Sequence, residues 1–206
     1  MTIKNIIFDF DGVILDSMPI RDFGFREIFK EFSEDLVEKF LQYHRYNGGI
    51  SRYIKIRYFY EELLNQNITE DKVNKLAEKF STIMKKELIN KKYLINQSVD
   101  FIKNNHKHYK LHIASGSDQI ELRYLCKELG LSEYFLSIHG SPTHKNDLVK
   151  GILESNSYNT NETILIGDSI NDYEASHAND INFYGYNNKK LKSCSKIYLN
   201  DYKELS

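Results

Sequence analysis

Hydrophobic and polar positions divide the chain into two regions of different periodicity. Residues 3–10 form a short apolar, β-branched run that ends in acids and Gly12, which indicates a buried strand. From about residue 18 to residue 90, apolar positions recur every three or four residues, as expected of helices. Breaks at 47–49 and 65–67 divide this helical stretch. The helical period is carried by Phe25, Ile28, Phe29, Phe32, Val73, Leu76, Phe80, Ile83 and Met84.

From residue 98 onward the pattern changes to short apolar runs that alternate with helical segments. A parallel sheet with helices on both faces gives this alternation. The expected strands are 110–114, 135–139 and 163–166, with weaker candidates at 181–186 and 197–199, and the expected helices are 99–105, 120–129 and 148–154.

The order of these regions predicts one α/β domain that is interrupted by a helical insertion. We assign residues 1–16 and 94–206 to a Rossmann-like core and residues 17–93 to an all-α lobe. A chain of 206 residues suits one core of ordinary size with an added lobe. Ligands of open parallel sheets bind at the carboxyl ends of the strands, so we expect the lobe to close over a site there.

Composition and charge argue against several classes of function for this chain. Apolar residues make up 41% and charged residues 28% of the chain, and the net charge of -1 gives no reason to expect nucleic acid or an anionic membrane. Cys126 and Cys194 have neither metal-ligand nor redox spacing. No apolar run approaches the roughly 20 residues of a membrane span, and the first run is too short for a signal peptide. We therefore expect a soluble, cytoplasmic protein, and the oligomeric state stays open.

Acids and small polar residues gather at the predicted strand ends. Asp9 and Asp11 follow the first strand at alternate positions, where side chains of an extended segment project to the same side. Gly12 then permits the backbone to turn. An ordinary acidic turn would give the same short pattern, but a calcium loop would not, because the other acids of an EF-hand are missing.

The next strand ends in Ser115 and Gly116, whose hydroxyl and amide groups suit phosphate oxygens. An alternative is a simple helix cap formed by Ser117 or Asp118. Lys145 precedes a predicted helix, and a lone lysine there is usually only solvated.

A second pair of acids follows the most apolar strand. Asp168 stands at the tip of that strand, and Asp172 follows after about one helical turn. Two acids beside the pair at the first strand would repel one another unless a cation is bound. Carboxylate oxygens favour Mg²⁺, so the sequence predicts a magnesium site.

Taken together, these residues resemble the four motifs of the haloacid dehalogenase superfamily, in order along the chain. The insertion lies where that superfamily carries its first-position cap. The resemblance implies that Asp9 attacks phosphorus and forms an aspartyl phosphate, and that Asp11 acts as general acid and base. It also implies phosphate contacts from Ser115, Gly116 and Lys145, and a Mg²⁺ site formed by Asp9, Asp11, Asp168 and Asp172, with Asp172 orienting Lys145 or a metal-bound water.

The expected reaction is hydrolysis of the phosphate monoester of a small metabolite, such as a sugar or polyol phosphate. Dehalogenation would leave the full set of metal-binding acids without a role, which disfavours it. Two alternatives stay open. One is a sugar phosphomutase similar to β-phosphoglucomutase, which requires a bisphosphate cofactor. The other is a non-catalytic binding protein on the same fold.

The glycine pair near residue 48 is the best candidate for a substrate-reading loop in the insertion. Arg45, Asn47 and Arg52 surround it, and the arginines suit a second anionic group on the substrate. A turn between helices with solvated arginines explains the pattern equally well. Arg21 and Asp22 are weaker candidates of the same kind. The lobe core is expected to include Tyr53, Ile54, Tyr58, Phe59 and Leu63.

Overall fold

The computed structural model describes residues 2–195 and 197–205. In this part of the chain, six parallel strands form one sheet in the order β3-β2-β1-β4-β5-β6. The first strand therefore lies at the centre, between β2 and β4, and the α/β fold class is confirmed. The strands are β1 (Asn5–Phe8), β2 (Lys110–Asp118), β3 (Ser137–Ser141), β4 (Thr163–Gly167), β5 (Asn182–Tyr186) and β6 (Ile197–Leu199).

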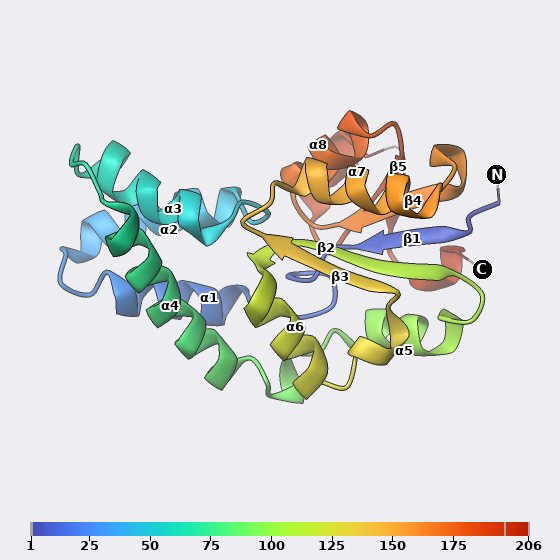
Figure 1. The fold of residues 1–206 in the computed structure, drawn as a ribbon, viewed down its shortest axis with the longest axis horizontal. Helices are drawn as coiled ribbons and strands as arrows, with labels where there is room; N and C mark the ends of the chain where they lie inside the picture. Colours follow the sequence, from blue (N-terminus) through green and yellow to red (C-terminus); the bar gives the residue numbers. More distant parts are fainter. Residues whose placement is uncertain (1, 196, 206) are drawn as a thin grey trace.

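Helices cover both faces of the sheet, as Figure 1 shows. Helices α5 (Asn96–Asn105) and α6 (Gln119–Glu128) lie on one face, and α7 (Lys145–Asn156) and α8 (Ile170–Ala178) lie on the other. Successive residues of a strand point to opposite faces of the sheet, and the residues of β1 are buried on both faces. Ile6 and Phe8 accordingly pack in one core cluster and Ile7 in the other.

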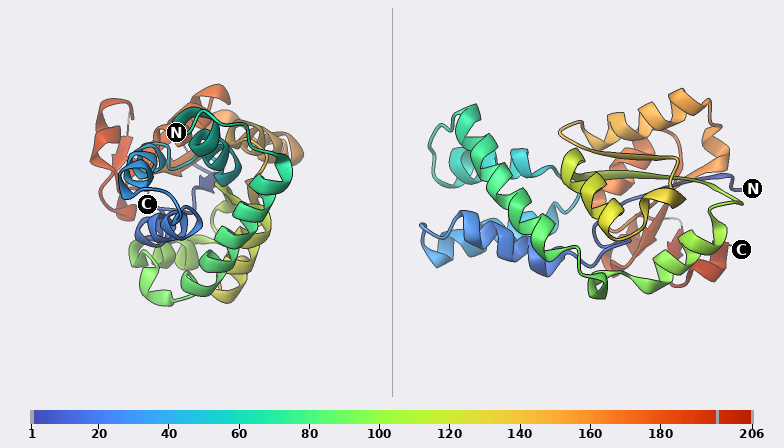
Figure 2. Two further views of the ribbon diagram at one scale, coloured as in Figure 1. Left: turned by 90° about the vertical axis from the view of Figure 1, so that its left-hand side faces the viewer. Right: turned by 60° about the horizontal axis from the view of Figure 1, so that its bottom comes forward.

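A helical lobe lies beyond the carboxyl ends of the strands (Figures 1 and 2). It consists of α1 (Met18–Ile28), α2 (Glu34–Tyr46), α3 (Arg52–Tyr58) with a π-helical turn (Phe59–Leu63), and α4 (Glu70–Glu87). Aromatic rings fill its centre: the Phe25 ring lies 4.4 Å from Phe80, and Phe29 stacks on Phe59 at 3.8 Å. Such pairs add about 0.5–1.5 kcal/mol each beyond the burial of their area.

The two chain segments that join the lobe to the sheet lie side by side. The Asp16 amide donates to the Tyr93 carbonyl at 2.8 Å, and the Ile95 amide donates to the Ile14 carbonyl at 2.9 Å. Leu15 and Leu94 form an antiparallel bridge between these bonds. The lobe is therefore attached through one pair of hydrogen-bonded segments.

Predicted element positions agree with the structure, and the differences are at element ends. The expected strand 110–114 continues to Asp118 as β2, with a register irregularity between Ala114 and Asp118. The expected helix 148–154 begins earlier, at Lys145, because the His144 side chain accepts from the Asn146 amide and caps it. Ile54 is 47% exposed, so its assignment to the lobe core was wrong. Short 3₁₀ turns occur at Lys91–Tyr93, Ser132–Tyr134, Thr160–Glu162, Lys189–Ser193 and Tyr202–Leu205.

No helix in the described residues has the length and apolar character needed to cross a bilayer.

Candidate active site

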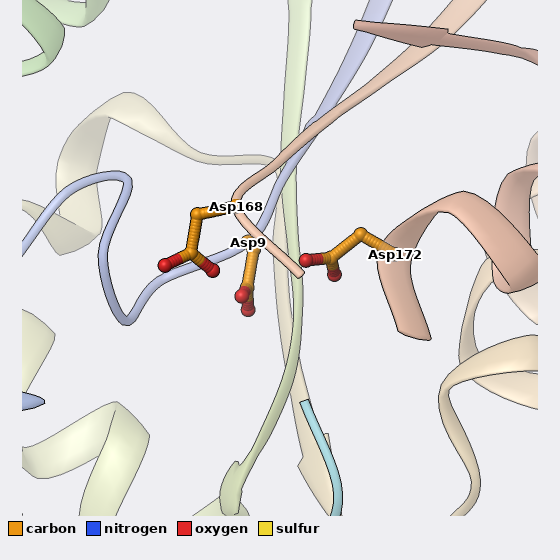
Figure 3. Close-up of side chains that lie close together, drawn as sticks. All are labelled: Asp9, Asp168 and Asp172. Carbon is orange, nitrogen blue, oxygen red and sulfur yellow. The ribbon is translucent and has the colours of Figure 1, made fainter. Parts of the chain in front are cut away.

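Three aspartates converge where the central strands end (Figure 3). Asp9 follows β1, Asp168 follows β4, and Asp172 lies in the first turn of α8. One carboxylate oxygen from each lies within 4.8 Å of the others. Because β1 and β4 are paired in the sheet, their carboxyl ends meet, and the site follows from the topology.

This group carries more negative charge than the surrounding protein neutralises. Burial, followed by repulsion from Asp172, raises the pKa of Asp9 to about 7. Burial and the Asp9 charge raise the pKa of Asp168 well above its ordinary value. A hard divalent cation prefers carboxylate oxygens as ligands. Asp9, Asp168 and Asp172 each offer one such oxygen at this place, so they fit Mg²⁺.

Lys145 is the cation that contacts this group. Its ammonium lies 3.0 Å from Asp9 Oδ1 and also contacts Asp172 Oδ1. Burial alone would lower the lysine pKa, but the Asp172 and Asp9 charges raise it above its ordinary value. The other Asp172 oxygen accepts from the amide and hydroxyl of Ser169, which closes a capping box on α8. Asp172 therefore holds Lys145 and the start of its own helix together.

Gly12 allows the Asp168 carboxylate to approach the first strand. Its φ is +76°, a left-handed conformation that glycine adopts without strain. A Cβ at this position would lie 1.9 Å from Asp168 Oδ2. The glycine after the acidic pair is therefore required for both the turn and the close packing.

Asp11 faces away from the three-carboxylate group and toward the helical lobe. Its Oδ1 accepts from Ser17 Oγ at 2.5 Å and Arg21 Nε at 2.7 Å, and its Oδ2 accepts from Ser117 Oγ at 2.5 Å. Burial raises the pKa of Asp11, but the Arg21 charge and these hydrogen bonds outweigh burial and lower it overall. The carboxylate is thus not among the grouped metal-ligand candidates, in contrast to the other three predicted acids.

The last residues of β2 contact both Asp11 and the lobe. Asp118 caps α6 by accepting from the Ile120 and Glu121 amides, whereas Ser117 donates to Asp11 instead. Ser115 is buried, and its hydroxyl accepts from the Ser117 amide at 3.1 Å. A Cβ on Gly116 would lie 2.2 Å from the Gly49 carbonyl oxygen, so the lobe loop rests against the predicted phosphate-binding segment.

The three lobe residues that the sequence predicted to contact substrate have different environments in the structure. Arg45 is exposed and pairs with Asp22 and Glu38 at 2.8 Å, as a solvated surface residue does. Asn47 donates to the Tyr43 carbonyl at the end of α2. Arg52 is 3% exposed and lines a small cavity next to Asp11.

Sequence reasoning missed most of the other lobe residues in this cavity. Lys55 and His44 line it together with Arg21, the weaker candidate. Glu121, from α6 of the core, is fully buried and contacts Arg21 at 3.4 Å and Arg52 at 2.5 Å. The spacing of Arg52 and Lys55, three residues apart on a helix, was the available signal, because such residues share a face.

Known structures share this architecture at low sequence identity. A β-phosphoglucomutase from Clostridium difficile is 19% identical, with a TM-score of 0.77, over 100% of this chain and 94% of its own. A predicted phosphoglycolate phosphatase from Haemophilus somnus is 15% identical, with a TM-score of 0.76, over 100% and 97%. A hydrolase from Bacillus subtilis bound to magnesium is 18% identical, with a TM-score of 0.74, over 100% and 97%. At these identities the likeness concerns the fold.

No curated protein sequence matches the chain. A family model described as "Haloacid dehalogenase-like hydrolase" matches residues 6–186. That span runs from β1 through the helical lobe to the end of β5, and so includes every predicted motif. The chain therefore belongs to the haloacid dehalogenase-like hydrolase family.

Proposed function

We propose that this hydrolase is a Mg²⁺-dependent phosphatase that cleaves the phosphate monoester of a small metabolite through an aspartyl phosphate on Asp9. The observation that carries the proposal is the contact of Asp9 with Lys145 within the group of three carboxylates, with Asp11 two residues away. Asp9 Oδ1 accepts from the Phe10 amide at 2.8 Å and from Lys145 at 3.0 Å, which fixes the orientation of the carboxylate. A fixed carboxylate at a strand end suits in-line attack on phosphorus.

In the first half of the reaction an Asp9 oxygen forms a bond to phosphorus, and the bond between phosphorus and the substrate oxygen breaks. The leaving alkoxide takes a proton from Asp11. In the second half a water oxygen attacks phosphorus, its proton returns to Asp11, and the bond to Asp9 breaks. The products are the alcohol, inorganic phosphate and the original carboxylate.

Asp11 must be protonated to act as the acid, although the Arg21 charge and its hydrogen bonds outweigh burial and lower its pKa. An anionic phosphoryl group beside it raises that pKa, because like charges disfavour ionisation. Ser115, the Gly116 amide and Lys145 would bind the phosphoryl oxygens. Mg²⁺ held by Asp9, Asp168 and Asp172, together with the Asp11 backbone carbonyl, would reduce the repulsion between the anionic nucleophile and the anionic substrate.

The test is release of inorganic phosphate from a panel of phosphorylated metabolites with Mg²⁺. Asp9→Asn should lower turnover at least about a thousandfold, because it removes the nucleophile. Asp16→Asn is the matched control, since Asp16 is exposed and its described contact is made by its backbone amide. Activity that survives in Asp9→Asn would refute the covalent route. Isomerisation of a sugar phosphate that depends on added bisphosphate would favour the mutase instead.

A further inference from the structure

Three buried cations line the cavity between the helical lobe and Asp11. Arg21 from α1 is 7% exposed, and Arg52 and Lys55 from α3 are each 3% exposed. The opposite wall includes Asp11 and Gly116, so the cavity adjoins the predicted acid and phosphate-binding segment. Any group bound here would belong to the part of the substrate that leaves with the alcohol oxygen.

The acids in contact with these cations do not balance them. Among the described residues, Asp11 pairs with Arg21, and Glu121 is shared by Arg21 and Arg52. Lys55 is in contact with neutral groups: its ammonium lies 3.0 Å from His44 Nδ1 and 3.3 Å from the Gly48 carbonyl. Burial, together with the Arg21 and Arg52 charges, lowers the pKa of Lys55 to about 7. Lys55 is therefore a buried amine that no acid contacts among the described residues.

Among the described residues, Arg52 and Lys55 retain hydrogen-bonding capacity for a ligand. All three nitrogens of Arg21 already donate, to Asp11, Ser117 and Glu121. On Arg52, Nη1 donates to Ser81 and Glu121, but Nη2 is buried and has no hydrogen-bond partner among the described residues. Lys55 has three ammonium hydrogens and two partners, which leaves one. One nitrogen on each of two neighbouring cations suits the two oxygens of a carboxylate better than the three of a phosphate.

We propose that this cavity binds a carboxylate carried by the leaving alcohol, through Arg52 Nη2 and the Lys55 ammonium. The substrate is then a phosphorylated hydroxy acid or sugar acid. This inference rests on the proposed phosphatase function and specifies its substrate class.

The test compares substrate pairs that differ in one acidic group. 3-Phosphoglycerate is paired with glycerol 1-phosphate, and 6-phosphogluconate with sorbitol 6-phosphate. Fructose 1,6-bisphosphate and fructose 6-phosphate form a third pair, which reports on a second phosphate. The acid of at least one of the first two pairs should be favoured at least about tenfold in kcat/KM, as one charge-assisted hydrogen bond provides.

Variants assign the preference to the cavity. Lys55→Met and Arg52→Met should each reduce the ratio of acid to neutral kcat/KM about tenfold or more, because each removes one carboxylate donor. Arg57→Met is the matched control on the same helix, since Arg57 pairs with Glu61 and Glu70 rather than lining the cavity. It should retain the preference. Far-UV circular dichroism establishes that each variant is folded.

Binding to the Asp9→Asn protein, measured by calorimetry with Mg²⁺, separates this inference from the proposed function. Preferential binding of an acid without turnover by the native protein would refute the phosphatase and retain the carboxylate site. Turnover that depends on Asp9 but shows no acid preference would refute the carboxylate site alone. A preference that survives Lys55→Met and Arg52→Met, or a larger preference for the bisphosphate, would also overturn it.

Discussion

Lys55 should destabilise the ligand-free protein, and replacing it with Met should reveal by how much. The side chain is 3% exposed, and burial with the adjacent Arg21 and Arg52 lowers its pKa from 10.5 to about 7. The unfolded chain binds this proton up to pH 10.5, whereas the folded chain releases it near pH 7. Between these values the unfolded state holds more protons, so this group makes stability rise with pH.

The size of the effect follows from the two pKa values. One pKa unit corresponds to about 1.4 kcal/mol, so Lys55 costs the folded state about 5 kcal/mol at pH 6 and about 1 kcal/mol at pH 9.5. Met has a similar length and no charge. The substitution removes the hydrogen bonds of Lys55 to His44 and Gly48, which costs about 1 kcal/mol each. Lys55→Met should therefore be more stable than the native protein by about 3 kcal/mol at pH 6, and this advantage should disappear by pH 9.5.

Urea unfolding at pH 6, 7.5 and 9.5, without Mg²⁺ or substrate, measures the difference. Far-UV circular dichroism is the appropriate signal because the chain contains no tryptophan. Other titrating groups are common to both proteins, so their contributions largely cancel. Lys150→Met, at a lysine that is 64% exposed on α7, is the control substitution. A difference for Lys55→Met that is constant from pH 6 to 9.5 would refute the reasoning.

Two further predictions concern the metal site and the contact between lobe and core. Mg²⁺ should raise the melting temperature of the native protein, and Asp168→Asn should lose most of that increase. Without metal at pH 7.5, Asp168→Asn should be more stable than the native protein, because it removes an acid whose pKa is raised by burial and by the Asp9 charge. Thermal melts with and without chelator test this, and an unchanged Mg²⁺-dependent increase would contradict it. Gly116→Ala should reduce kcat/KM at least about tenfold with little change in stability, because its Cβ would lie 2.2 Å from the Gly49 carbonyl oxygen and hold the lobe away. Gly151→Ala, where nothing lies within 4 Å of the added Cβ, is its control, and equal activity of the two variants would show that the lobe adjusts without cost.

The sequence was most informative where chemistry and strand pattern coincide. Asp9 and Asp168 follow apolar runs, and parallel strands place such ends at one edge, so their proximity could be expected before any coordinates were considered. The helical insertion was predictable for the same kind of reason, because its apolar period differs from that of the sheet. Lys145 was harder to interpret from residues alone, since its contacts with Asp9 and Asp172 join separate elements.

Residues of the lobe cavity could not be assigned from the sequence, because burial of a charge is a tertiary property. Arg45 and Arg52 flank the same glycine pair and have the same local signature, yet one ends α2 in solvent and the other begins α3 in the cavity. Glu121 lies on α6, far from both in the chain, and its role becomes visible only when the lobe is placed against the core. Lys55 lies three residues after Arg52 on α3, and its burial depends on where the lobe lies against the core.

The paired segments at Asp16 and Tyr93 make the lobe an exchangeable module. Because its two ends leave the sheet side by side, the closure entropy of the inserted segment depends only weakly on its length, by about 0.6 kcal/mol for each doubling. A different lobe, or a short turn, grafted between these positions would leave the strand ends that carry Asp9 and Asp168 in place. Evolution and protein engineers can therefore replace the lobe at this junction while these two aspartates keep their places.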